Sequence, residues 1–77
     1  MESDLIEYIA KSLVDDPSAV SVKTVQTDES TVIELRVAAD DIGKVIGKRG
    51  RIAKAMRTLL SASANRASKD LKLQIID

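Results

Sequence analysis

The chain has 77 residues, which suits one small domain with little room for a deep catalytic pocket. It contains no cysteine and no histidine, which excludes disulfide bonds, thiolate chemistry and the commonest general base. Its apolar runs are far shorter than the roughly 20 residues that cross a bilayer, and its acidic start is unlike a signal peptide. These features predict a cytoplasmic protein that is not an enzyme and carries no metal or cofactor.

The net charge of zero hides a polarised chain. Residues 1–43 hold three basic and ten acidic side chains, whereas residues 44–77 hold nine basic and two acidic. Eight Lys or Arg residues and no acid lie between Asp41 and Asp70. This asymmetry predicts a basic face that attracts a polyanion, although the same cations could merely solvate a helix.

The first segment has the pattern of an amphipathic helix. Ser3 can cap a helix that runs to about Val14, where the pair of aspartates before Pro17 ends it. Four apolar residues then share one face of this helix: Leu5, Ile6, Ile9 and Leu13.

Two β-branched, alternating segments follow, at residues 20–26 and 31–37. Residues 27–30 between them have turn chemistry, so the two segments predict an antiparallel hairpin. In the second strand, three apolar residues share one face: Ile33, Leu35 and Val37.

The second half predicts two helices and a strand. Asp40 can cap a short helix through about Ile46, a glycine turn interrupts it, and a longer helix runs over about 51–68. One side of the longer helix is formed by Ile52, Met56, Leu59, Leu60, Ser63 and Ala67. The opposite side is formed by Arg51, Lys54, Arg57, Thr58, Ser61 and Asn65. Alternating Leu71, Leu73 and Ile75 predict a last strand over 71–76.

The predicted order is therefore α-β-β-α-α-β. The connection between the second and third strands is long enough to cross over and form a parallel pair. We expect a single α+β domain over residues 1–77, with a three-stranded mixed sheet and three helices on one face. The other sheet face should stay polar, with three exposed candidates: Val32, Glu34 and Arg36.

A basic turn, Gly47-Lys48-Arg49-Gly50, separates the two crossover helices. Glycine tolerates positive φ and has no Cβ, so such a turn lets a phosphate backbone approach the main chain closely. The two central residues, Lys48 and Arg49, are cations and therefore also favour a phosphate backbone as the ligand. The alternative is an ordinary helix C-cap followed by a turn.

The element order, with this turn between the crossover helices, resembles a KH domain of the prokaryotic type (type II). Residues 43–57 resemble especially the small bacterial single-KH proteins of the KhpA family, as do residues 5–9 and 73–77. Many KH domains place isoleucine three residues after the second glycine, whereas this chain has Ala53 there and Ile52 before it.

The resemblance implies a groove that clamps about four nucleotides of single-stranded RNA with weak sequence specificity. It also implies a role as an RNA chaperone or post-transcriptional regulator, linked to cell shape. The implied partners are a second copy of the chain or a larger KhpB-type KH protein.

Each part of the predicted site has a local physical role. Gly47 and Gly50 let the sugar-phosphate chain lie against the backbone, Lys48 and Arg49 supply charge, and N–H groups near Arg51 meet a phosphate. The candidates for an apolar wall are Ile46, Ile42 and Val37, with plain core packing as the alternative for the two isoleucines. The candidates for a positive rim are Lys44, Arg51 and Lys54. Arg57 is not predicted to contact the RNA, because it can simply be solvated on the far side of the helix.

Two other functions remain open from the residues. Small residues on the outside of the long helix would let a second helix approach: Ala55, Thr58, Ser61, Ala62 and Asn65. The fold could thus serve mainly as a protein-interaction or dimerisation module. A helix-turn-helix DNA binder would instead place Arg51, Lys54 and Arg57 in a major groove.

Overall fold

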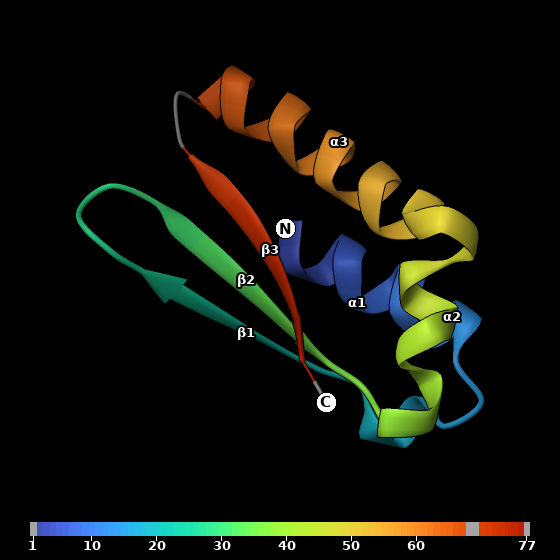
Figure 1. Ribbon diagram of the computed structural model, residues 1–77. Helices are drawn as coiled ribbons and strands as arrows, with labels where there is room; N and C mark the ends of the chain where they lie inside the picture. The colour runs from blue at the N-terminus through green and yellow to red at the C-terminus, as the bar shows by residue number, and fades with distance from the viewer. Residues whose placement is uncertain (1, 68–69, 77) are drawn as a thin grey trace.

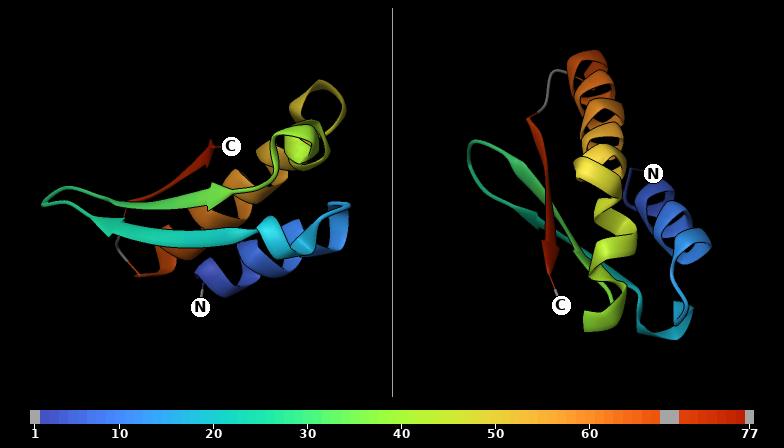
Figure 2. Two further views of the ribbon diagram at one scale, coloured as in Figure 1. Left: turned by 90° about the horizontal axis from the view of Figure 1, so that it is seen from below. Right: turned by 45° about the vertical axis from the view of Figure 1, so that its right-hand side comes forward.

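The computed structural model describes residues 2–67 and 70–76 and shows an α+β fold with the predicted order of elements. The elements are α1 (Glu2–Leu13), β1 (Ser21–Gln26), β2 (Thr31–Arg36), α2 (Ile42–Ile46), α3 (Arg51–Ala67) and β3 (Leu71–Ile76). The three helices lie on one side of the sheet (Figures 1 and 2). Within the described ranges, no helix is long and apolar enough to span a membrane.

The sheet has the strand order β1-β2-β3. β1 pairs antiparallel with β2, and β2 pairs parallel with β3, as the long crossover predicted. Thr27 and Ser30 close the hairpin, because the Thr27 N–H donates to the Ser30 carbonyl at 2.8 Å and the Ser30 N–H donates to Thr27 Oγ1 at 3.0 Å. The mixed sheet thereby places the C-terminal strand beside the long helix α3 (Figure 1).

The core lies between the sheet and the helices. Its largest fully buried side chains are Ile6, Ile33, Leu35, Met56, Leu60 and Val45. The predicted inward face of β2 is confirmed, since Ile33, Leu35 and Val37 are all buried. On the outer sheet face Arg36 is exposed as predicted, whereas Val32 and Glu34 are half-buried.

The predicted helix faces need correction. In α1 the buried residues are Ile6 and Ala10, while Leu5 and Leu13 are exposed. In α3 the core-facing positions are Ala53, Met56, Leu60 and Ala64, whereas Leu59 is 47% exposed. Ala10, Ala53 and Ala64 are all buried, and a helical wheel weighted by hydrophobicity gives such small residues too little weight. The predicted positions Asn65, Ala67 and Ser68 have no described side chains.

The two predicted helix caps, Ser3 and Asp40, are also wrong. Ser3 lies inside α1, which begins at Glu2. Asp40 lies in a 3-10 turn, Ala39–Asp41, and Asp41 is the residue that precedes α2. The Asp41 side chain makes no capping hydrogen bond to the backbone of α2, because its carboxylate accepts instead from the Asp15 and Asp16 N–H groups and from the Lys44 side chain.

Candidate functional site

The glycine turn lies between α2 and α3 and is built from left-handed backbone. Gly47 has φ 81° and ψ 171°, Gly50 has φ 74°, and Arg49 has φ 59° and ψ 25°. L-amino acids rarely adopt such angles, and a non-glycine residue held there commonly marks a functional segment. The chain therefore turns sharply and presents Lys48 and Arg49 to solvent between two glycines.

Contact with Ile52 explains why position 47 must be glycine. A Cβ built on Gly47 would lie 2.6 Å from Ile52 Cγ1 and 2.9 Å from Ile52 Cβ. Ile52 thus packs directly beneath the turn, while the following Ala53 faces the core and is 4% exposed. In many KH domains the isoleucine stands at the position of Ala53. Here Ile52 fills the space under the turn instead, so this exchange leaves no cavity beneath Gly47.

The Arg51 N–H at the start of α3 is not free, contrary to the prediction. The Arg51 N–H donates to the Lys48 carbonyl, and the Gly50 N–H donates to the Gly47 carbonyl at 3.0 Å. These bonds close the turn and stabilise its shape. A phosphate at this site would accordingly be met by the side chains of Lys48 and Arg49.

A group of exposed cations surrounds the turn and continues along α3: Lys48, Arg49, Arg51, Lys54 and Arg57. In the part of the chain whose side chains the structure describes, no ion pair involves any of these five residues. Unpaired cations close together raise the local positive potential, so this surface attracts a polyanion.

The three apolar candidates lie at different depths. Ile46 is 37% exposed beside the turn, and Ile42 is half-buried against the core. Val37 is only 3% exposed, so its side chain offers no surface to a ligand.

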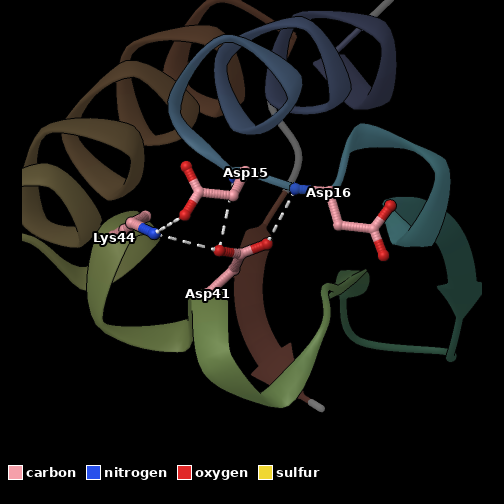
Figure 3. A network of polar contacts seen from close by, with 4 residues as sticks. All are labelled: Asp15, Asp16, Asp41 and Lys44. Atoms are coloured by element: carbon pink, nitrogen blue, oxygen red, sulfur yellow. Dashed lines mark hydrogen bonds and ion pairs between the residues drawn. The ribbon is translucent and has the colours of Figure 1, made fainter.

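Lys44, predicted on the positive rim, is held in a polar network (Figure 3). Its Nζ forms ion pairs with Asp15 and, at 3.3 Å, with Asp41. Asp41 also accepts hydrogen bonds from the backbone N–H groups of Asp15, at 3.3 Å, and Asp16, at 3.1 Å. Lys44 and Asp41 thus join the end of α1 to the start of α2. The network positions α2 and leaves Lys44 less available to a ligand than the five unpaired cations.

Asp41 is the charged residue of the buried core region, at 2% exposure. Burial by itself raises the pKa of Asp41, but the hydrogen bonds from Asp15, Asp16 and Lys44 together outweigh burial and lower that pKa below its ordinary value. The hydrogen bond with Asp15 is the largest cause that raises the pKa of Lys44. Both shifts favour the charged pair, which keeps the start of α2 attached to α1.

A groove between α3 and β3 is the main feature that sequence reasoning missed. It has a volume of about 330 Å³ and is lined by Arg57, Leu60, Ser61, Leu71, Lys72 and Leu73. Its floor is apolar, and Arg57 and Lys72 are exposed cations on its two sides. Arg57 received no role from the sequence because it could simply be solvated on the far side of the helix, whereas in the structure it lines this groove. Ser61, assigned to the outer small-residue face, also lines this groove.

The edge of α3 connects the glycine turn to this groove. Gly50, Lys54, Arg57 and Ser61 follow one another at spacings of four, three and four residues, which places them along one side of a helix. A ligand that follows this edge passes two cations on its way from the turn to the groove. A larger hollow, of about 440 Å³, lies at the hairpin tip, but Asp28, Glu29 and Asp70 line it and would repel a polyanion.

The fold and the turn together define a class of protein. A mixed three-stranded sheet, whose parallel strands are joined by two helices with a Gly-x-x-Gly turn between them, is a KH domain. The family model described as the KH domain of KhpA/KhpB matches residues 3–75, and the chain belongs to this family. The prediction that the chain is not an enzyme is confirmed by this membership.

Curated relatives agree over nearly the whole chain. The chain is 53% identical over 77 residues to the RNA-binding protein KhpA of Treponema pallidum, covering 100% of this chain and 96% of the relative. It is 49% identical over 76 residues to the RNA-binding protein KhpA of Borreliella burgdorferi, covering 99% and 93%. For the Clostridium perfringens protein of that name, the identity is 52% over 73 residues, covering 95% and 97%. No solved structure matches the chain significantly.

Proposed function

We propose that this protein binds single-stranded RNA along a path from the Gly47–Gly50 turn to the groove between α3 and β3. The observation that carries the proposal is the group of exposed cations at the turn and along α3, which have no ion-pair partner among the described side chains and lead to an apolar-floored groove. The relatives named above as RNA-binding proteins support the same ligand. The path suits about four nucleotides, the usual length for a KH domain.

Each region has a separate role in this proposal. Lys48 and Arg49 hold a phosphate at the left-handed turn, and Gly47 and Gly50 leave room for the sugar-phosphate chain. Lys54 and Arg57 hold the following phosphates, with Arg51 adding charge on the outside of α3. Ile46, with Ile42 behind it, and the leucines of the groove provide apolar surface for bases.

Binding should be weak and sensitive to salt. The only aromatic residue, Tyr8, lies on α1, so base stacking on aromatic rings contributes nothing at the turn, on α3 or on β3. If three or four phosphates are neutralised, the logarithm of the binding constant should fall with the logarithm of salt at a slope of about −2 to −3. Fluorescence polarisation of a labelled single-stranded RNA across a salt series measures this slope.

Competition in the same assay tests the choice of ligand. Unlabelled single-stranded RNA should displace the probe, whereas duplex DNA of equal phosphate content should compete poorly. Binding that does not change with salt, or stronger competition by duplex DNA, would contradict the proposal. A helix-turn-helix mode is not supported by the fold, because α2 has five residues and the two helices connect parallel strands.

We further propose that the chain associates with a second copy or with a larger KhpB-type KH protein. The outside of α3 carries Leu59, 47% exposed, beside the exposed alanines Ala55 and Ala62. Linking two weak sites raises effective concentration and hence affinity for a longer RNA. Such association suits a role in RNA chaperoning or post-transcriptional regulation, including the control of cell shape that the family resemblance implies.

Sedimentation equilibrium tests the association with a second copy. The apparent mass of the wild type should rise toward that of a dimer with concentration, and Leu59→Glu should lower it to that of a monomer. A constant monomer mass for the wild type would refute self-association. If association persists while the chain has no affinity for RNA, the fold serves as a protein-interaction module instead.

A further inference from the structure

Asp41 is the only buried charged residue in the part of the chain whose side chains the structure describes, at 2% exposure. Both oxygens of its carboxylate have partners (Figure 3). Oδ1 accepts from the Asp15 N–H and from Lys44 Nζ, each at 3.3 Å, and Oδ2 accepts from the Asp16 N–H at 3.1 Å. Burying a carboxylate is costly even when it has partners, so a buried charge is weak evidence for a gain in stability. The position of Asp41 therefore calls for a second explanation.

Asp41 precedes a helix that is too short to hold its own orientation. α2 has five residues, and helices shorter than about 12 residues are marginal in isolation. Val45 is fully buried, but apolar contact is non-directional and fixes the depth of α2 better than its rotation. Hydrogen bonds are directional. The two bonds that Asp41 accepts from the backbone of residues 15 and 16 therefore fix how α2 is turned.

The segment that donates these two bonds is itself held in place. Val14 is buried, and its N–H donates to the Ala10 carbonyl at 3.1 Å, which continues the pattern of α1. Pro17 follows the two donors and has a φ fixed by its ring. The N–H groups of Asp15 and Asp16 thus form a fixed point against which α2 is oriented.

The other end of α2 leads directly into the glycine turn. The Gly47 N–H donates to the Gly43 carbonyl at 2.9 Å, so the first glycine of the turn is still bonded to α2. Lys48 and Arg49 follow at once in the chain. A rotation of α2 at its beginning would therefore displace both cations of the turn.

We propose that Asp41 is a positioning residue for RNA binding, which touches no RNA and holds α2 in the orientation that presents Lys48 and Arg49 to a phosphate. This inference rests on the RNA-binding function proposed above. Because the Asp41 side chain is buried against the end of α1, it acts on the ligand through the backbone of α2. By thermodynamic linkage, RNA bound at the turn must also strengthen the contact of Asp41 with residues 15 and 16.

Asp41→Asn is the variant that tests this assignment. An amide keeps the size of the carboxylate but has a single acceptor oxygen, so at least one of the two backbone N–H groups loses its partner. Affinity for a labelled single-stranded oligouridylate should fall about fivefold, within the range that changes at a distance from a ligand produce. Electrostatics alone predicts the opposite sign, because loss of an acidic charge makes the protein more attractive to RNA.

Asp16→Asn is the matched control. It removes the same charge from an exposed side chain, which accepts a hydrogen bond from the Ser18 hydroxyl. The Asp16 N–H that donates to Asp41 belongs to the backbone and is kept. The affinity of this control for the oligouridylate should equal or slightly exceed that of the wild type. Circular dichroism selects a temperature at which every variant is folded, with sucrose added to all samples where Asp41→Asn needs it.

Amide hydrogen exchange of the wild type gives a readout that a purely structural role would not move. Exchange of the Asp16 N–H, which is bonded to Asp41, should slow about fivefold when the oligouridylate saturates the protein. The Thr27 N–H, bonded to the Ser30 carbonyl in the hairpin, is the reference and should exchange at an unchanged rate.

Four results would overturn the assignment of Asp41. Wild-type affinity of Asp41→Asn, or an equal loss of affinity in Asp16→Asn, would show that the buried carboxylate does not position the turn. Unchanged exchange of the Asp16 N–H on RNA binding would show that the two sites are not linked. An Asp41→Asn variant that stays unfolded even in sucrose would show that the fold itself requires the carboxylate. All four presuppose a wild type that binds the oligouridylate, and a wild type that does not bind it would instead refute the proposed function.

Discussion

Replacing both Lys48 and Arg49 by Asp is expected to reduce affinity for single-stranded RNA by at least about a hundredfold at moderate salt. With each phosphate contact that is lost, one counterion fewer is released when the RNA binds. Each new carboxylate also repels the phosphate that would lie beside it. Both side chains are exposed and have no ion-pair partner among the described residues, so the fold loses no contact. Fluorescence polarisation gives the affinity, and circular dichroism confirms that the double variant is folded.

A matched control separates the position of the charges from their number. Lys11→Asp with Lys23→Asp changes the net charge by the same amount on α1 and β1, outside the turn, α3 and β3. This control should lose only a few-fold in affinity, through the general field of the protein. Equal losses for the two double variants would mean that the turn is not the clamp. Undiminished binding by the Lys48 and Arg49 variant would favour the protein-interaction alternative.

The second large effect is expected at Gly47. Its backbone, with φ 81° and ψ 171°, lies in a region that is essentially restricted to glycine, and forcing another residue there costs about 1–3 kcal/mol. The new Cβ would also lie 2.6 Å from Ile52 Cγ1, and such overpacking costs typically 1–3 kcal/mol. Gly47→Ala should therefore lower stability by about 2–4 kcal/mol, a large part of the total for a small domain.

Gly50→Ala is the control that isolates the contact with Ile52. Gly50 also has positive φ, at 74°, but a Cβ there would meet nothing within 4 Å. Urea unfolding should show a clearly smaller loss for Gly50→Ala than for Gly47→Ala. Equal losses would mean that backbone conformation alone sets the cost and that Ile52 yields freely. Because the turn must deform in Gly47→Ala, its affinity for RNA should fall as well.

Secondary structure was predictable wherever a short segment carries its own signal. The last strand, Leu71–Ile76, has the predicted bounds, because alternation of apolar residues is a local property. The hairpin follows equally from its four-residue turn. The helix faces were less predictable, since Ala53 and Ala64 are core residues and Leu59 is exposed. Which face of a helix is buried depends on how the helix is oriented against the sheet and the other helices. A helical wheel carries no information about that orientation.

The candidate site also has a part that was predictable from a short segment and a part that was not. The turn, its glycines and its two cations were predicted from residues 47–50, which are contiguous. The role of Lys44 was not, because its partner Asp15 is 29 residues away in the sequence. The groove was missed entirely, since its lining residues from α3 and β3 come to lie around one hollow only after the chain has returned to the sheet.

The sequence alone determined the order of the elements, the left-handed basic turn and the polarity of charge along the chain. Each of these depends on backbone preference or on residues within a few positions of one another. Tertiary structure alone decided which cations remain unpaired, which isoleucine is exposed and where an apolar groove opens. Those outcomes depend on distances between segments far apart in the chain, because ion pairing and burial are set by proximity in space.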